Sequence, residues 1–324
     1  MKRTHASILA ITALAGIFLS GCATSAPGDE SGAGAGDTGG ELTSIKVGVI
    51  PFAELAPFYI AIEDGIFDEH GLVVEPTQAS GGASLITSLA SGELQFIYSN
   101  YVSMLQASSR GIPLEIVREN DRPGAQAIYV LPDSGITTPT DLAGKSIAVN
   151  SLGNIMELTS RAALEDAGVD LDTVTFVEIP PPNMTAALEQ GQVDAAWLVE
   201  PFVTLASGSL GVTVAADVFG GDAADLPIAG WATTPQFASE NAETVDAFIA
   251  ALDEASAIAV DDPSRVAEII PTYTEIPAEV AAKLAPIAFT PTSELADIAQ
   301  VQDLMIRFGY YTEPVDIDEL APAR

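Results

Sequence analysis

Short apolar runs rich in β-branched residues alternate with amphipathic stretches of helical period from residue 45 to about residue 229. Alternation of this kind is typical of βαβ units, in which helices connect neighbouring parallel strands. The helical stretches cover 57–67, 83–91, 101–110 and 155–167, and the chain beyond residue 235 is mainly helical. The pattern predicts an α/β fold with mainly parallel sheets flanked by helices. The predicted strands span 45–49, 72–75, 96–98, 114–117, 127–131, 146–149, 174–179, 195–198 and 212–215.

The pattern repeats once, at an offset of about one hundred residues. The run 47–49 corresponds to 147–149, and the turn glycines Gly92 and Gly191 stand at matching points. Two similar lobes explain this repeat, and chance similarity between generic βαβ units is the alternative. We expect lobe 1 to comprise residues 45–132 and 230–324, and lobe 2 to comprise 133–229. The two chain crossings between them then form a hinge, and the lobes enclose a cleft.

The first 21 residues have the pattern of a secretory signal peptide. A basic start at Lys2 and Arg3 precedes an apolar run over 6–19, and this run is shorter than the ~20 residues of a membrane span. The run leads to Leu19-Ser20-Gly21-Cys22, which resembles the lipobox of bacterial lipoproteins. We expect cleavage before Cys22 and its acylation, which would anchor the protein to the outer face of the cytoplasmic membrane. An ordinary cleaved signal with an incidental cysteine is the alternative.

The composition of the mature chain limits the classes of partner and cofactor that it can bind. Residues 22–44 are small, polar and glycine-rich, which predicts a flexible tether behind the lipid anchor. The formal net charge of −33 comes from 45 acidic and 12 basic residues, so nucleic acid is excluded as a partner. Because Cys22 is the only cysteine, disulfides and thiolate metal sites are excluded as well. We expect a monomer without metal or other cofactor.

The mature chain lacks the residues of common catalytic sites. Its one histidine, His70, falls in a turn between a predicted helix and a strand. Neither a Ser-His-Asp set nor a histidine-based metal site can be assembled from it. Glycine motifs for nucleotide phosphates are also absent. The sequence therefore favours binding over catalysis, while an extracytoplasmic enzyme of the same fold and a ligand sensor remain as alternatives.

Several segments together resemble one known family. These segments are 47–51, 56–61, 63–67 and 70–74 at the start, then 81–82, 89–92, 141–145, 191–195 and 200–202. In order and spacing they are similar to the nitrate/sulfonate/taurine and thiamine-pyrimidine-precursor solute-binding proteins of ABC importers. The resemblance implies a type II periplasmic-binding-protein fold that closes around one small molecule. It also implies delivery of that solute to the permease subunits of an importer.

Candidate ligand-binding residues follow from the rule that ligands sit at the carboxyl ends of strands, beside helix N-termini. Four segments meet this description, although each can also be a turn with a helix N-cap. Ser99, Asn100 and Tyr101 follow another predicted strand and can supply hydrogen bonds. The residues of the four segments are Phe52 and Glu54; Ser80, Gly81 and Gly82; Asn150, Ser151 and Asn154; and Pro182 and Asn183.

Three further side chains are candidates with open alternatives. Glu200 follows a strand and can accept a hydrogen bond from a ligand, or it can be a helix-start carboxylate before Pro201. Trp231 lies near the second crossing and can stack on a ring, whereas Phe58 fits either cleft or core. The four helix-start segments carry no Lys or Arg. This favours a neutral, aromatic or weakly polar ligand, and a sulfonate or nitrate held by helix N-termini is the alternative.

Overall fold

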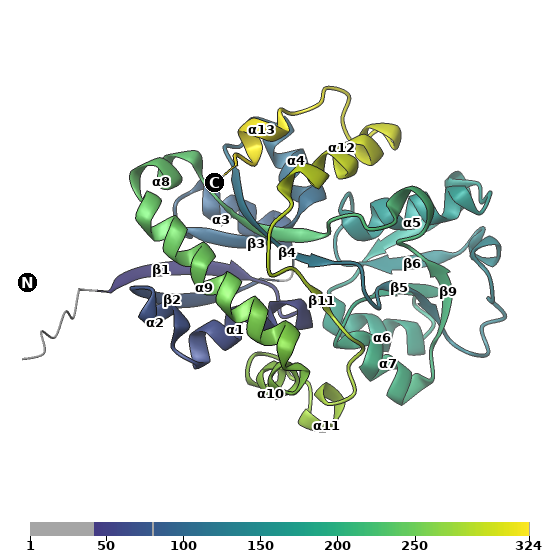
Figure 1. The fold of residues 1–324 in the computed structure, drawn as a ribbon. Coiled ribbons are helices and arrows are strands. Elements are labelled where there is room, and N and C mark those ends of the chain that lie inside the picture. The colour runs from purple at the N-terminus through teal and green to yellow at the C-terminus, as the bar shows by residue number, and fades with distance from the viewer. Residues whose placement is uncertain (1–41, 80, 324) are drawn as a thin grey trace, which may run out of the picture. The chain divides into compact units, whose positions relative to one another are not determined.

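The computed structural model describes residues 42–79 and 81–323, which belong to one compact unit of the chain (Figure 1). The predicted signal peptide, Cys22 and nearly all of the predicted tether lie outside these residues, as does Ser80. No helix within the described ranges is both long enough and apolar enough to cross a membrane.

The first sheet combines parallel strands with antiparallel strands. β1 (Thr43–Val49) pairs in parallel with β2 (Leu72–Gln78) on one side and β3 (Phe96–Asn100) on the other. β10 (Ala229–Thr233) is antiparallel to both β3 and β4 (Glu115–Arg122), and the short β11 (Ala288–Phe289) pairs with β4. The strand order is β2-β1-β3-β10-β4-β11. β10 was not predicted, because its segment reads as a chain crossing.

The second sheet repeats this arrangement. Its order is β7 (Thr175–Glu178), β6 (Ser146–Val149), β8 (Ala195–Leu198), β5 (Ala127–Val130) and β9 (Thr213–Asp217). β6 is parallel to β7 and β8, and β5 is antiparallel to β8 and β9. The matching order supports the internal repeat seen in the sequence. In each sheet one antiparallel strand, β10 or β5, follows directly on a chain crossing.

One detail of the predicted architecture needs completing and another needs correction. Most strands of each sheet run in one direction, as predicted, but each sheet also contains opposed strands: β10 and β11 in the first sheet and β5 in the second. The segment 127–131, expected in lobe 1, forms β5 of the second sheet, so the first crossing lies between residues 122 and 127. We use "lobe 1" and "lobe 2" below for the parts built around the first and the second sheet.

The helices cover both faces of each sheet (Figure 1). The predicted helix 57–67 is two helices, α1 (Ala56–Glu63) and α2 (Ile66–Glu69), because Gly65 takes a φ of 75° that interrupts the helical backbone. The other helices are α3 (Gly82–Ala90), α4 (Tyr101–Ser109), α5 (Ile155–Asp166), α6 (Pro181–Glu189), α7 (Phe202–Leu210), α8 (Pro235–Glu240), α9 (Ala242–Asp261), α10 (Pro263–Tyr273), α11 (Ala278–Ala281), α12 (Ile298–Arg307) and α13 (Ile317–Leu320).

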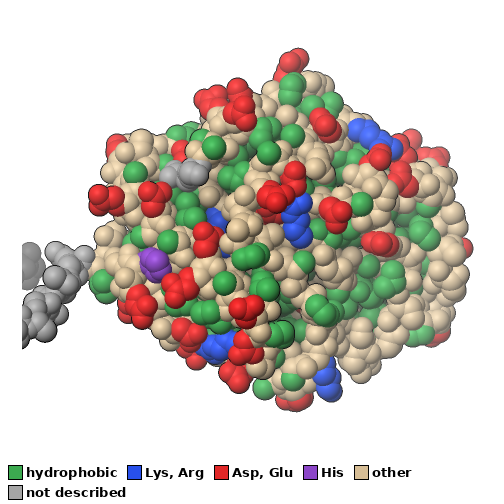
Figure 2. All heavy atoms as spheres, in the orientation of Figure 1, with side chains coloured by type: hydrophobic (Ala, Val, Ile, Leu, Met, Phe, Trp, Pro, Cys, Tyr) green, Lys and Arg blue, Asp and Glu red, His purple; other side chains and the backbone are tan. Residues whose placement is uncertain are grey.

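The core of lobe 1 is aromatic. Phe248 of α9 stacks on Phe96 of β3 with ring centroids 4.1 Å apart, and its ring also lies 5.6 Å from that of Phe67. The α9 positions Val245, Phe248 and Leu252 recur at helical spacing and are fully buried. Acidic side chains are scattered over the face shown in Figure 2, in agreement with the excess of acidic over basic residues in the chain.

Candidate functional site

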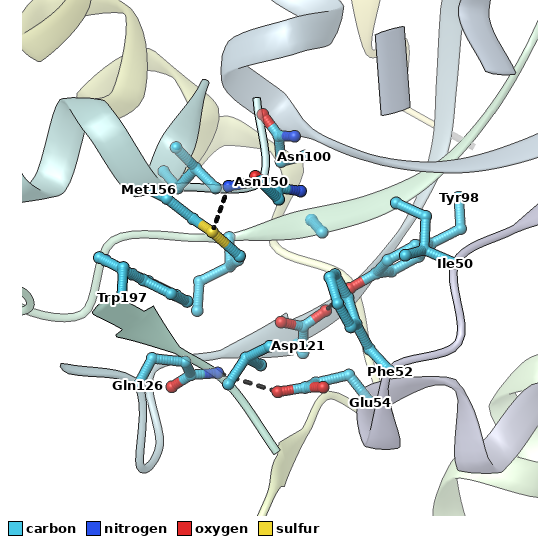
Figure 3. Close-up of a pocket in the computed structure, with 14 residues that line it drawn as sticks. Ile50, Phe52, Glu54, Tyr98, Asn100, Asp121, Gln126, Asn150, Met156 and Trp197 are labelled. Atoms are coloured by element: carbon cyan, nitrogen blue, oxygen red, sulfur yellow. Dashed lines mark hydrogen bonds between the residues drawn. The ribbon is translucent and has the colours of Figure 1, made fainter. Parts of the chain in front are cut away.

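A cavity of about 30 Å³ lies where strand ends of the two sheets meet (Figure 3). Lobe 1 contributes residues after β1, on β3 and β4 and at the start of β10, and lobe 2 contributes residues beside β5, β6 and β8 and on α5. This volume holds about one or two waters, whereas an apolar cavity of about 150 Å³ is needed for benzene. The lining residues are Ile50, Phe52, Glu54, Tyr98, Asn100, Asp121, Gln126, Asn150, Ile155, Met156, Trp197, Val199, Ile228 and Ala229.

Two buried carboxyl groups mark one end of the cavity. Glu54 lies in the 3-10 helix η1 (Ala53–Leu55) just after β1, and Asp121 lies near the end of β4. The Tyr98 hydroxyl donates to Asp121 Oδ1 at 2.8 Å, and Gln126 Nε2 donates to Glu54 Oε1 at 3.1 Å. Asn120 Nδ2 donates to the Glu54 carbonyl oxygen at 2.9 Å and to Asp121 Oδ1 at 3.2 Å, so one amide holds both segments together.

Each of these carboxyl groups keeps one oxygen free of protein hydrogen bonds. Glu54 is 2% exposed and Asp121 is 1% exposed. Glu54 Oε2 and Asp121 Oδ2 have no hydrogen-bond partner among the described residues. Among the described side chains that line the cavity there is no Lys, Arg or His. This end of the cavity is therefore rich in acceptors and lacks a compensating protein cation.

The surroundings raise the pKa of both carboxyl groups. Burial raises the pKa of Asp121 to about 7 against the hydrogen bonds from Tyr98 and Asn120, and the Glu119 carboxylate adds to the rise. Burial, together with the negative charges of Asp121 and Glu200, holds the pKa of Glu54 well above its ordinary value. Close, desolvated carboxyl groups resist losing both protons.

The free energy of unfolding should fall as the pH rises from 5 to 8. Asp121 titrates near 3.9 in an unfolded chain and near 7 in the folded protein, so the folded state alone holds this proton between those pH values. The associated stability is present below about pH 4 and is lost as the pH rises through about 7. Asp121→Asn removes this titration. Between pH 5 and 8 the free energy of unfolding of wild type should therefore fall by about 1–3 kcal/mol relative to that of the variant.

Urea denaturation of wild type and Asp121→Asn at several pH values measures this difference. The difference between the two proteins reports on Asp121 together with the effect of its charge on the pKa of Glu54, because the proteins share every other titrating group. Parallel dependence of the two proteins on pH would show that Asp121 has an ordinary pKa.

Two amide side chains lie at the other end of the cavity (Figure 3). Asn100 caps α4 by accepting from Ser103 N at 2.9 Å. Asn150 follows β6, and its Oδ1 accepts from Asn154 Nδ2. Asn154 in turn caps α5 by accepting from Met156 N at 3.1 Å. The predicted N-cap role of Asn154 is thus present in the structure, and through its contact with Asn150 it also positions a cavity residue.

Apolar and aromatic side chains form the walls between the two ends. Phe52 and Ile50 come from the loop after β1, and Met156 and Trp197 face them from lobe 2 (Figure 3). Trp197 Nε1 donates to Thr159 Oγ1 at 3.2 Å, which fixes the indole. Trp197 is buried and also lines the cavity.

Four of the predicted ligand-binding residues belong to the core of lobe 1. Trp231 and Phe58 are fully buried and stack on each other with ring centroids 5.1 Å apart. Ser99 and Tyr101 are also fully buried, and none of the four is among the cavity-lining residues. The position of Trp231 beside a crossing misled the sequence interpretation, because the segment after that crossing is the central strand β10.

The two glycines at the start of α3, Gly81 and Gly82, lie close to other predicted residues but do not line the cavity. A Cβ on Gly81 would stand 2.9 Å from Ser151 Oγ, so this loop of lobe 1 touches the loop after β6 of lobe 2. A Cβ on Gly82 would stand 2.0 Å from Ser99 Oγ, which explains the absence of a side chain there. Pro182 and Asn183 are exposed in the first turn of α6, away from the cavity lining.

Glu200 takes the helix-start role that the sequence left open. Its Oε2 accepts from Thr204 N at 3.1 Å, and its Oε1 accepts from Thr204 Oγ1 at 2.8 Å. Oε1 also accepts from Ala285 N at 2.9 Å, a group that follows the helices packed on lobe 1. Glu200 is buried but does not line the cavity. The carboxyl groups that face the cavity are Glu54 and Asp121.

Hydrogen bonds join the lobes on more than one side of the cavity. Ala53 N donates to the Glu200 carbonyl oxygen at 3.1 Å, and Gln106 Nε2 donates to the Gly153 carbonyl oxygen at 2.8 Å. Together with the small cavity, these contacts describe a closed arrangement. The cavity of about 30 Å³ is smaller than an organic solute.

The sequence interpretation missed most of the cavity residues that come from within strands or from the crossings. Asp121 and Gln126 are the main polar examples, and Tyr98 was read only as part of a strand. The available signal was the polar run 118–122 after an apolar strand, which is unusual for residues that prove to be buried. Arg118 and Arg122 of this run make structural contacts: Arg118 Nε donates to Asp253 Oδ1 at 2.8 Å, and Arg122 Nη2 donates to Asp297 Oδ2 at 2.9 Å.

The described residues include no group of three or more His, Cys, Asp or Glu side chains placed to hold a metal ion. His70 lies in the turn after α2, where its Nε2 is 3.1 Å from Glu254 Oε2, and it does not line the cavity. The arrangement is thus suited to enclosing a small molecule between acceptor groups, amides and aromatic walls.

The fold and the cavity define a two-lobed α/β protein of the type II periplasmic-binding-protein class. An alkanesulfonate-binding protein from Xanthomonas axonopodis pv. citri, in a structure bound to MOPS, matches with a TM-score of 0.73 at 19% identity. This match covers 87% of the present chain and 99% of that chain. The chain belongs to the family described as NMT1/THI5 like, whose family model matches residues 53–266.

Two relatives carry names that state a ligand. The taurine-binding periplasmic protein of Escherichia coli (strain K12) is 28% identical over 210 residues, which is 64% of each chain. The formylaminopyrimidine-binding protein of Halalkalibacterium halodurans is 25% identical over 182 residues, covering 56% of this chain and 52% of that protein. These matches span less than two thirds of the relatives' own lengths. Both are described as binding proteins, in agreement with the expectation of binding over catalysis.

Proposed function

We propose that this protein is an extracytoplasmic lipoprotein that binds a small organic solute between its lobes and delivers it to the permease of an ABC importer. The observation that carries the proposal is the cavity itself, which lies between strand ends of both sheets, contains unpartnered polar atoms and would widen by separation of the lobes to admit a solute. Ligands of open α/β sheets sit at such strand ends. Family membership supports the same role.

The solute is proposed to be non-anionic, with an aromatic or weakly polar body. Phe52, Tyr98 and Trp197 supply aromatic surface, whereas Glu54 and Asp121 supply acceptors. A sulfonate would find no Lys or Arg among the described side chains that line the cavity, and either carboxyl group would repel it whenever that group is ionised. The second candidate is nevertheless a sulfonate binder, because the taurine-binding and alkanesulfonate-binding proteins are among the matches.

A thermal-shift panel on the purified protein tests the proposal. The panel contains taurine, ethanesulfonate, nitrate, an aminopyrimidine, benzamide and benzoate. A bound solute raises stability by RT ln(1 + [L]/Kd), which is about 2.7 kcal/mol at one hundred times Kd. We expect at least one non-anionic member to stabilise the protein and to be recovered chemically unchanged. Recovery of an altered molecule would indicate an enzyme of this fold, and stabilisation by sulfonates alone would favour the second candidate.

Replacement of Cys22 should detach the protein from the membrane. Stable membrane attachment by acyl chains requires the modified cysteine, and residues 22–44 carry no other anchor signal. We expect Cys22→Ala to appear in the medium or to accumulate as the unprocessed precursor, whereas Ser25→Ala in the same segment stays membrane-bound. Cell fractionation and metabolic labelling with a fatty acid measure this. A Cys22→Ala protein that is processed and retained at the membrane would contradict the lipid anchor.

A further inference from the structure

At the end of the cavity that holds Glu54 and Asp121, each carboxyl group has one oxygen to which the protein donates no hydrogen bond. Glu54 and Asp121 each use one oxygen in a hydrogen bond to a fixed protein donor, Gln126 and Tyr98 respectively. The other oxygen of each group is buried without a partner among the described residues. Buried acceptors and charges are costly unless they are paired. Protonation relieves the charge when the cavity is empty, and a donor group from outside the protein would satisfy the same oxygens with the carboxyl groups ionised.

The geometry limits what that partner can be. Asn120 Nδ2 lies within 3.2 Å of both segments, which fixes Glu54 beside Asp121. Figure 3 shows the two carboxyl groups at the same end of the cavity, below the wall formed by Phe52 and near Trp197. A single metal ion would have only these two carboxyl groups, because the described residues contain no third acidic, His or Cys ligand in such a group. A group with several N–H donors has enough donors to supply one to each free oxygen.

We infer that the solute presents a cationic nitrogen group, such as an amidinium or a protonated amino-substituted ring, to the free oxygens of Glu54 and Asp121. This inference rests on the proposed function and narrows its ligand from non-anionic to cationic. Planar nitrogen cations match carboxyl oxygens with parallel N–H donors, and these charge-assisted hydrogen bonds are the strong ones. The aromatic side chains beside the pair also favour a cation over a neutral isostere.

The titration of Glu54 and Asp121 makes the binding of a cationic solute depend on pH, which provides a second test of the inference. At neutral pH the neighbouring charges of Glu119 and Glu200 and the burial of the site favour the protonated carboxyl forms. A cation favours the ionised forms, so its binding releases protons. The affinity for a permanent cation should therefore increase as the pH rises from 6 to 8, whereas the affinity for a neutral isostere should not.

Isothermal titration calorimetry with three probes of one shape tests the inference. Benzamidinium, benzamide and benzoate carry charges of +1, 0 and −1 on the same ring. The full-length protein, purified in detergent, should bind benzamidinium at least about tenfold more tightly than benzamide and should bind benzoate most weakly. Asp121→Asn and Glu54→Gln should each weaken benzamidinium binding at least about tenfold. Glu93→Gln, the same change on an exposed turn before β3, should leave it unchanged.

A measurement on wild type alone keeps the inference testable if the substituted proteins misfold. Titrations of wild type near pH 7 in buffers of different ionisation enthalpy should show proton release with benzamidinium and none with benzamide. Equal binding of benzamidinium and benzamide, or benzamidinium affinity unchanged in both cavity variants, would overturn the inference. If benzamide or a sulfonate binds while benzamidinium does not, the inference fails and the proposed function stands. Failure of every probe and of the thermal-shift panel would count against both.

Discussion

Trp231→Ala should lower the free energy of unfolding by about 3–5 kcal/mol, the usual cost of removing a large buried aromatic side chain. Trp231 is fully buried on β10, between Phe58 at a ring-centroid distance of 5.1 Å and Phe248 at 5.4 Å. Its Nε1 donates to Asn120 Oδ1 at 3.0 Å, and the truncation leaves that oxygen unpaired in the core. Urea denaturation followed by circular dichroism measures the loss.

Trp231→Phe separates packing from hydrogen bonding in the same position. It keeps most of the aromatic volume and removes only the N–H donor, so its cost should be about 1–3 kcal/mol. Because Asn120 also holds Glu54 and Asp121, this variant should weaken ligand binding indirectly. Wild-type stability of Trp231→Ala combined with loss of ligand binding would restore the sequence interpretation, in which the indole stacks on the ligand.

The strand-end rule predicted the part of the site that follows directly on strands. Phe52 and Glu54 come after β1, Asn100 ends β3 and Asn150 comes after β6, and all four line the cavity. The rule works because consecutive parallel strands bring their carboxyl ends to one edge, and local sequence alone identifies such strands. The parallel neighbours β2-β1-β3 and β7-β6-β8 correspond between the sheets because each set is built from repeated βαβ units.

The sequence did not predict the site residues whose positions depend on the antiparallel strands. Asp121 was missed because a run of charged residues normally ends a strand, whereas β4 continues through it to Arg122. The run stays inside because its partners come from distant segments: Arg118 meets Asp253 of α9, and Arg122 meets Asp297 at 2.9 Å. Gln126 belongs to a crossing whose exact place is decided by the pairing of β5 with β8 and β9.

Glu200 shows why two interpretations had to stay open. A carboxylate before a helix looks the same in sequence whether it faces a ligand or the helix start. Its contact with Ala285 N joins residues 85 positions apart. Only the packing of the C-terminal helices on lobe 1 brings that donor to Glu200, and no local pattern reports such packing. The same holds for Trp231, whose burial depends on the insertion of β10 between β3 and β4.

Gly81→Phe should hold the lobes apart and weaken solute binding strongly. A Cβ at Gly81 would already stand 2.9 Å from Ser151 Oγ of lobe 2, and a phenyl ring cannot be accommodated by rotation of one hydroxyl group. The backbone of Gly81 is extended, with a φ of −167°, so a larger residue introduces no backbone strain of its own. The conflict therefore arises on closure. If the closed form falls to about one part in a hundred, the apparent affinity falls about 100-fold.

Small-angle scattering and calorimetry on one ligand test this together with the hinge. Wild type should show a smaller radius of gyration with saturating ligand than without it, whereas Gly81→Phe should keep the larger radius under both conditions. Gly208→Phe is the matched control, because Gly208 is exposed on α7 and a Cβ there meets no atom within 4 Å. It should bind and compact like wild type. Undiminished affinity in Gly81→Phe would mean that closure of these two loops does not contribute to binding, and the hinge would have to act elsewhere.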